Sequence, residues 1–216
     1  MKAVLFDMDG VIFDSERAVF GVWQEVAAEL GLERIERVFV RCVGVTKTRT
    51  REIFSEAYPT LCFEDFDGRV RARFGERYGG GRLPLKPGAR EVLAALREMG
   101  FPLALASSTK TETVRRELEE AGLLAYFDAV IGGDMVTNSK PDPEIFLTAA
   151  SRLGVSAGDC WVIEDSYNGI RAASAGGMRA IMVPDLLPPD AEMKEKAAAI
   201  VPDLFAALAL LVPPLP

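Results

Sequence analysis

The chain has 216 residues, of which 49% are hydrophobic and 26% are charged, so it can build a substantial globular core. Its formal net charge of -7 excludes broad binding to nucleic-acid backbones, which requires clustered lysine and arginine. Cys42, Cys62 and Cys160 are not closely paired, which favours a reducing, cytoplasmic location over a disulfide framework. No apolar run approaches the roughly 20 residues of a membrane-spanning helix, so we expect no membrane partner.

The chain opens on a short apolar run, Ala3–Phe6, which we predict to be a buried strand. Apolar side chains then recur at helical spacing from Ser15 to Leu30, and more helix follows without a strong strand signal. Gly79, Gly80 and Gly81 precede two prolines and form a return linker. We therefore predict an all-helical insertion, or cap, over residues 15–81 and a core made of residues 1–14 and 82–216.

The second half of the chain alternates predicted strands with predicted helices. The expected strands are Pro102–Ala106, Ala129–Ile131, Trp161–Ile163 and Arg179–Val183, and a helix over Ala89–Met99 precedes the first of them. This alternation predicts an α/β fold with a doubly wound, Rossmann-like parallel sheet. Ligands of such sheets bind at the carboxyl ends of the strands.

Local signals predict where two of the helices begin. Thr109 and Glu112 have the spacing of a capping box for a helix that ends at Gly122. Asp142 and Pro143 are expected to be the N-cap and first residue of a helix that ends at Gly154.

Polar residues follow four of the five predicted strands at the edge where ligands bind. Asp7 and Asp9 follow the first strand, Ser107 and Ser108 the second, Lys140 lies after the third, and Glu164 and Asp165 end the fourth. Taken singly, these are ordinary turn residues, helix caps or solvated charges. Together, carboxylates about 4 Å apart repel by roughly 4 kcal/mol per pair at an effective dielectric of 20, so they require a cation. The sequence contains no histidine, and an all-oxygen site favours Mg²⁺ over zinc.

The motifs DMDGV at Asp7, ALASST at Ser107, SKPDP at Lys140 and VIEDSYNG at Glu164 and Asp165 occur in this order. In this the chain resembles the haloacid dehalogenase-like hydrolase superfamily, in its helical-cap branch that includes β-phosphoglucomutase-like phosphatases.

The resemblance implies a role for each of these residues. Asp7 would be the nucleophile that forms an aspartyl-phosphate, and Asp9 the general acid and base. Ser107 and Lys140 would hold the phosphoryl oxygens, with Ser108 beside them as a substrate contact. Mg²⁺ would be bound by Asp7, the Asp9 backbone carbonyl and Asp165, with Glu164 close by.

In the cap, the segment CVGVTKTRTREIF resembles a loop that reaches into the site, which makes Lys47 and Arg49 candidate substrate contacts. Solvated surface charges are an equally good interpretation of both. Trp23 is expected to belong to the cap core.

The expected function is a Mg²⁺-dependent phosphatase for a small phosphorylated metabolite, a sugar or polyol phosphate, and the enzyme is expected to be a monomer or weak dimer. The alternative is a sugar phosphomutase of the β-phosphoglucomutase type. Mutases of this branch carry a cap histidine where this chain has Val19, which favours the hydrolase. A phospho-acceptor receiver module and a purely metal-binding domain are the rival classes. The early Asp pair and the insertion oppose the receiver. The variant Asp7→Asn distinguishes an enzyme from a purely metal-binding domain, because metal binding should survive the substitution but turnover should not.

Overall fold

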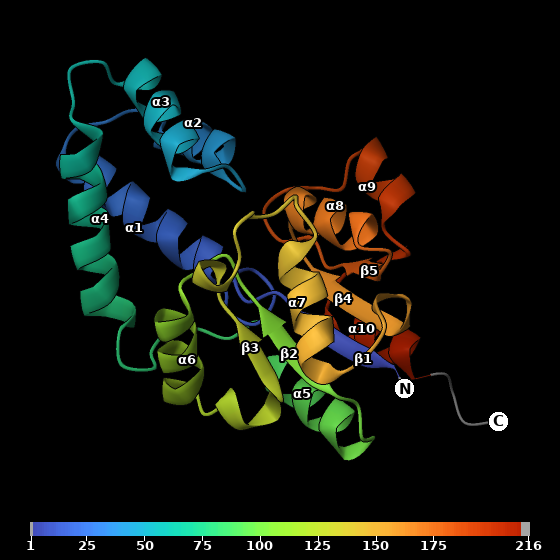
Figure 1. Cartoon of the computed structure of the whole chain (residues 1–216). Helices are drawn as coiled ribbons and strands as arrows, with labels where there is room; N and C mark the ends of the chain where they lie inside the picture. Colours follow the sequence, from blue (N-terminus) through green and yellow to red (C-terminus); the bar gives the residue numbers. More distant parts are fainter. Residues whose placement is uncertain (1, 213–216) are drawn as a thin grey trace. The chain divides into compact units, whose positions relative to one another are not determined.

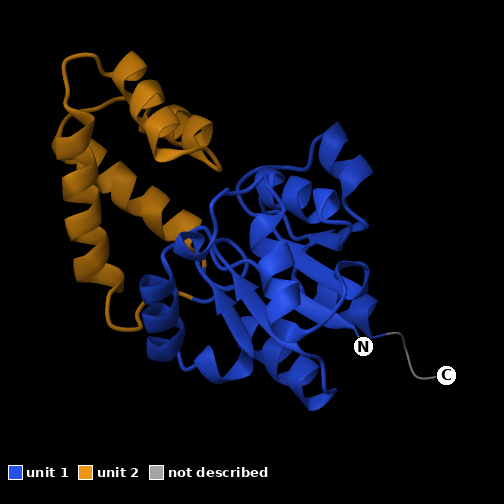
Figure 2. Cartoon of the chain, in the orientation of Figure 1, with its two compact units in different colours: residues 1–13, 85–216 blue, residues 14–84 orange. Residues whose placement is uncertain are grey.

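A computed structural model describes residues 2–212 of the chain. The chain divides into two compact units, one made of residues 1–13 and 85–216 and the other of residues 14–84 (Figure 2). The chain therefore leaves the first unit after Phe13 and re-enters it at Leu85. These two residues pair through an isolated antiparallel bridge inside the first unit.

Within residues 2–212 the first unit contains a sheet of six parallel strands in the order β3-β2-β1-β4-β5-β6 (Figure 1). The strands are β1 Ala3–Phe6, β2 Leu103–Ala106, β3 Ala129–Ile131, β4 Cys160–Glu164, β5 Arg179–Met182 and β6 Ala199–Ile200. The order reverses between β1 and β4, which makes the sheet doubly wound and confirms the predicted fold class. The sequence did not predict β6, whose two half-buried residues are too few for a periodic signal.

Helices cover both faces of the sheet. They are α5 Ala89–Glu98, α6 Thr111–Glu120, α7 Glu144–Leu153, α8 Tyr167–Ala175, α9 Ala191–Lys196 and α10 Leu204–Leu211, with short 3-10 turns η1 Leu124–Tyr126, η2 Gly133–Met135 and η3 Ala157–Asp159. Helices α7, α8 and α9 share one core cluster with Leu5 of β1 and Val162 of β4. Helices α5 and α10 pack against each other on the opposite face (Figure 1). Every side chain of β1 and β2 is buried as a result, as expected for a parallel sheet.

The second unit consists of four helices in its described residues 14–84: α1 Ser15–Glu29, α2 Ile35–Cys42, α3 Lys47–Ala57 and α4 Phe63–Tyr78. Trp23 lies at the centre of its core, 5.1 Å from the ring of Phe39 and 5.0 Å from that of Phe66. Both contacts are edge-to-face, a favourable geometry for aromatic pairs. Trp23 is only 7% exposed, so the structure agrees with its expected core position.

Three of the arginines of α4 are paired with acidic side chains. Arg73 contacts Glu29 at 2.8 Å and Arg77 contacts Glu25 at 2.5 Å, while Arg71 contacts Asp67. Exposed pairs of this kind contribute little to stability. Each of these three arginines therefore has a negative charge beside it.

Two predicted helix starts differ in the structure. Helix α6 begins at Thr111, one residue later than a cap at Thr109 predicts, because Asp134 accepts hydrogen bonds from the backbone N–H and the hydroxyl of Thr111. The Thr109 hydroxyl donates to Asp9 instead. Helix α7 begins at Glu144, one residue late, although the Asp142 carboxylate does accept the Glu144 N–H at 2.9 Å. In the first case a contact from a distant segment replaces the local cap.

None of the described helices is long and apolar enough to cross a membrane. Cys42, Cys62 and Cys160 are all free thiols.

We predict that Trp23→Ala destabilises the second unit by about 3–5 kcal/mol, because it leaves a cavity among three aromatic rings. Chemical denaturation followed by circular dichroism measures this loss. Val40→Ala is the matched control, since Val40 lies in the same unit but is 52% exposed, and it should change the free energy of unfolding by less than about 0.5 kcal/mol. Equal losses for both variants would contradict the assigned core.

Candidate active site

Four of the chain segments that meet at the carboxyl edge of the sheet carry polar side chains. Asp7 directly follows β1, Ser107 follows β2, and Glu164 ends β4. The fourth segment, the loop between η2 and α7, contributes Lys140. Because β1 lies between β2 and β4, these side chains converge around Asp7.

Lys140 connects two of the carboxylates. Its Nζ donates to Asp7 Oδ1 at 2.5 Å, to Glu164 Oε1 at 2.8 Å and to the carbonyl oxygen of Ala106 at 3.2 Å. The ammonium group also lies 4.7 Å from the centre of the Phe146 ring. The side chain of Lys140 is 6% exposed and that of Glu164 is 1% exposed, so this is a buried charge network. Removing one member of such a network leaves the others with an uncompensated charge.

Glu164 is held by the first turn of α8 as well as by Lys140. Its Oε2 accepts the backbone N–H of Ser166 at 2.7 Å, and the Ser166 hydroxyl accepts the N–H of Gly169 at 3.0 Å. A Cβ on Gly169 would lie only 1.7 Å from Glu164 Oε1, so the absence of a side chain there allows the carboxylate its position. The motif after β4 thus fixes the position of the Glu164 carboxylate.

Asp7, Glu164 and Asp165 form a group that can hold a metal ion, since one carboxylate oxygen from each lies within 4.8 Å of the others. The donors are all oxygen, which suits Mg²⁺. Gly10 lies against this group and has a φ of +78°. A Cβ at this position would lie only 2.4 Å from Asp165 Oδ2, so there is no room for a side chain. Among residues 2–212 the Asp9 carboxylate is not part of this group, and it accepts a hydrogen bond from the Thr109 hydroxyl at 3.4 Å.

Burial raises the pKa of Asp7 from 3.8 to about 8. Lys140 opposes this rise in the Asp7 pKa, while the negative charges of Glu164 and Asp9 add to it. For Lys140, burial lowers the pKa, but its two carboxylate partners outweigh burial and hold the pKa above its usual value. One buried lysine therefore does not fully offset the cost of ionising Asp7, and a cation in the acidic group would supply further positive charge.

Ser107 is 1% exposed, and its hydroxyl accepts the backbone N–H of Thr109 at 3.1 Å. Its own N–H donates to the carbonyl of Ile131, which ties the end of β2 to β3. Ser108 is exposed. The segment after β2 thus places one buried and one open hydroxyl at the same edge as Asp7.

Lys47 and Arg49 lie in the second unit, at the start of α3. Lys47 Nζ contacts Asp67 Oδ2 at 2.8 Å, and Arg49 contacts Glu52 at 2.7 Å. Both side chains are about half exposed, at 56% and 49%. Their roles as substrate contacts stay predictions.

Two features near the site were not predicted. Glu117 of α6 is partly buried, and burial together with the charge of Asp9 raises its pKa to about 7. In the sequence it is one of several acids in a helix, so no local signal distinguishes it. Lys86, just after the return linker, pairs with Asp185 beyond β5 at 2.8 Å, and its backbone N–H donates to Ile12. These two contacts hold the chain, where it re-enters the first unit, beside the loop that follows β1.

Comparison with known proteins identifies the family. A model of the haloacid dehalogenase-like hydrolases matches residues 1–177. The chain belongs to this hydrolase family. The resemblance noted in the four motifs is therefore confirmed.

Relatives in this family carry names that describe phosphatases. The phosphorylated carbohydrates phosphatase of Thermotoga maritima is 37% identical over 182 residues, 84% of each chain. Hexitol phosphatase B of Escherichia coli is 31% identical over 190 residues, 84% of this chain and 83% of that protein. A crystal structure from Thermotoga maritima, described as that of a candidate beta-phosphoglucomutase, matches with a TM-score of 0.80 at 34% identity and covers 98% of each chain.

We predict that Gly169→Ala weakens Mg²⁺ binding at least about tenfold, because the new Cβ displaces the Glu164 carboxylate and disturbs the adjoining acidic group. Isothermal titration calorimetry measures the affinity. Gly158→Ala is the control, since a Cβ at Gly158 meets nothing within 4 Å, and it should bind Mg²⁺ like the wild type. Unchanged affinity in Gly169→Ala would show that Glu164 is irrelevant to the metal.

We also predict that Mg²⁺ affinity rises about tenfold per pH unit up to about pH 8 and then levels, because the ion displaces the proton of Asp7. The stability of the metal-free protein should change with pH in the opposite direction to the Mg²⁺ affinity. Since the folded state keeps a proton that the unfolded chain releases near pH 3.8, stability falls as the pH rises towards about 8. Melting temperatures measured with and without Mg²⁺ at pH 6, 7 and 8 test both trends. A difference between the two melting temperatures that becomes smaller as the pH rises would contradict them.

Proposed function

We propose that this protein is a Mg²⁺-dependent phosphatase that transfers a phosphoryl group from a small phosphorylated carbohydrate or polyol to Asp7 and then to water. The observation that carries the proposal is the position of Asp7. It lies at the end of the central strand, 7% exposed, between the ammonium group of Lys140 and the acidic residues Glu164 and Asp165. This arrangement combines a carboxylate nucleophile with positive charge for the phosphoryl oxygens.

The chemical steps follow from the two carboxylates after β1. An oxygen of Asp7 attacks the phosphorus atom while Asp9 donates a proton to the leaving ester oxygen. Asp9, now ionised, accepts a proton from the water that attacks the aspartyl-phosphate, which releases inorganic phosphate and restores Asp7. The hydrogen bond from Thr109 supports this role, because it orients the Asp9 carboxylate.

Ser107 and Lys140 would hold the phosphoryl oxygens during both steps, and the exposed Ser108 would contact the substrate. Asp7, Glu164, Asp165 and the Asp9 backbone carbonyl would hold Mg²⁺, which when bound neutralises negative charge on the acids and the phosphate. The raised pKa of Asp7 supports this requirement, because a protonated carboxyl group is not a nucleophile.

The substrate class rests on the relatives. Two of them are named for phosphorylated carbohydrates and hexitols, so we propose a sugar or polyol phosphate here. The second unit would act as the cap that selects the substrate and excludes water, with Lys47 and Arg49 as candidate contacts. Lys47 would exchange its pairing with Asp67 for a group on the substrate.

A phosphomutase is the second candidate, supported by the likeness to the candidate beta-phosphoglucomutase structure. A mutase must protect its aspartyl-phosphate from water until a second substrate binds. The position of the expected cap histidine is occupied by Val19, and the chain contains no histidine at all. We therefore propose a phosphatase first and a phosphomutase second.

We predict that the wild type with Mg²⁺ releases inorganic phosphate from a panel of hexose and hexitol phosphates. Asp7→Asn should lower the rate by at least about 10³-fold, since it removes the nucleophile. The panel is followed by ³¹P NMR and includes β-glucose 1-phosphate.

Asp7→Asn also controls for contaminating phosphatases. Phosphate release at equal rates by both proteins would overturn the assignment of Asp7. Formation of glucose 6-phosphate from the 1-phosphate would identify a mutase instead.

A further inference from the structure

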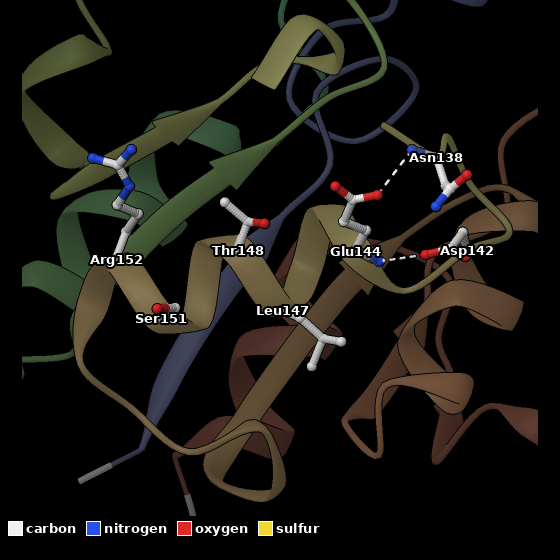
Figure 3. A pocket seen from close by; sticks show the side chains of 7 residues that line it. All are labelled: Asn138, Asp142, Glu144, Leu147, Thr148, Ser151 and Arg152. Carbon is white, nitrogen blue, oxygen red and sulfur yellow. Dashed lines mark hydrogen bonds between the residues drawn. The ribbon is translucent and has the colours of Figure 1, made fainter. Parts of the chain in front are cut away.

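Lys140 extends from an irregular and open segment. Residues 136–143 connect η2 to α7, and Thr137, Asn138 and Ser139 are all exposed. An open groove of about 530 Å³ borders this segment and the outer face of α7, lined by Asn138, Asp142, Glu144, Leu147, Thr148, Ser151 and Arg152 (Figure 3). On this side solvent, not packed side chains, adjoins the segment. Hydrogen bonds therefore have to hold it in place.

Glu144 supplies two of these hydrogen bonds. Its Oε1 accepts the backbone N–H of Thr137 at 2.9 Å, and its Oε2 accepts that of Asn138 at 2.8 Å. Figure 3 shows the carboxylate turned back from the first turn of α7 towards Asn138. Hydrogen bonds to a charged acceptor are stronger than those between neutral groups. The side chain thus ties the beginning of the segment to the helix at which the segment ends.

A second pair of contacts tightens the same loop. The backbone N–H of Asp142 donates to the carbonyl of Ser139 at 3.1 Å, and the Asp142 carboxylate accepts the N–H of Glu144 at 2.9 Å. Lys140 lies inside this loop. Its backbone is therefore enclosed between Asn138, held by Glu144, and Asp142, held at the start of α7.

Helix α7 gives the loop a fixed reference. Ile145 and Phe146, the residues directly after Glu144, are 1% and 0% exposed in the core. The Phe146 ring lies beneath the ammonium group of Lys140 at 4.7 Å. The same turn of helix therefore contacts the base of the Lys140 loop through Glu144 and the tip of the Lys140 side chain through Phe146.

We propose that Glu144 is a positioning residue that acts through Lys140: by binding the N–H groups of Thr137 and Asn138, it holds Lys140 against Asp7 and Glu164. Its importance for catalysis rests on the proposed function, whereas its effect on Lys140 does not. Loss of the Glu144 carboxylate frees the loop on its solvent side, and Lys140 then leaves the buried network for part of the time.

The first test measures the accessibility of Lys140 without reference to activity. The rate of acetylation of Lys140 by acetic anhydride, followed by mass spectrometry, should be low in the wild type because the side chain is 6% exposed and doubly paired. Glu144→Ala should raise this rate at least about tenfold. Glu144→Gln keeps one acceptor oxygen and should give an intermediate rate.

The matched control is Asp203→Ala, which removes another carboxylate that accepts a backbone N–H at a helix start, that of Ala206 at 2.8 Å in α10. It should leave Lys140 protected, and the exposed Lys194 should react equally in all variants. If Lys140 is acetylated as slowly in both Glu144 variants as in the wild type, the proposal is overturned.

The second test links the effect to anion binding. Glu144→Ala should weaken the binding of inorganic phosphate in the presence of Mg²⁺ about tenfold, and should weaken it less than about twofold when Lys140→Ala is already present. Equal losses in both backgrounds would mean that Glu144 acts independently of Lys140. If the wild type itself neither binds phosphate nor releases it from substrates, the proposed function fails, and the acetylation rates still decide the role of Glu144.

Discussion

The contact on which the rest of the site depends is the buried ion pair between Lys140 and Asp7. Burial of a carboxylate at the end of the central strand is unfavourable, as the raised pKa of Asp7 indicates, and it is tolerated because an ammonium group lies at 2.5 Å and a second carboxylate shares it. The remaining negative charge of Asp7, Glu164 and Asp165 is the physical reason to expect a cation. The proposed nucleophile, the lysine proposed to bind phosphate and the acidic group that can hold a metal are thus one electrostatic unit.

The fold brings this unit together by topology. Parallel strands all end at the same edge, and the strand order reverses next to β1, so that loops from both halves of the sheet meet there. Small backbone features then set the side chains. Gly10 and Gly169 leave room for Asp165 and Glu164, and Glu144 closes the loop that carries Lys140. Several elements far apart in the sequence therefore determine the position of one lysine.

The second unit has its own core and its own charge balance. Its aromatic centre around Trp23 explains how four helices form a compact unit without a sheet. Arg71, Arg73 and Arg77 contact acids within the unit, so any anion that bound them would have to compete with these partners. Selectivity that arises from such exchange depends on the exact geometry of the bound substrate, which is why family membership alone leaves the substrate open.

The sequence by itself determined the fold class, the strands β1 to β5 and the polar residues at their ends, because hydrophobic periodicity and the order of the four motifs are local properties of the chain. It also identified Asp7, Lys140, Glu164 and Asp165 as residues that converge. Only the tertiary structure decided that Asp134 caps α6, that Lys86 pairs with Asp185, that Glu117 lies near Asp9 and that Glu144 closes the Lys140 loop. The reason is physical: these interactions join segments through space, and side chains such as Glu117 and Glu144 look like ordinary helix acids until the fold gives them partners.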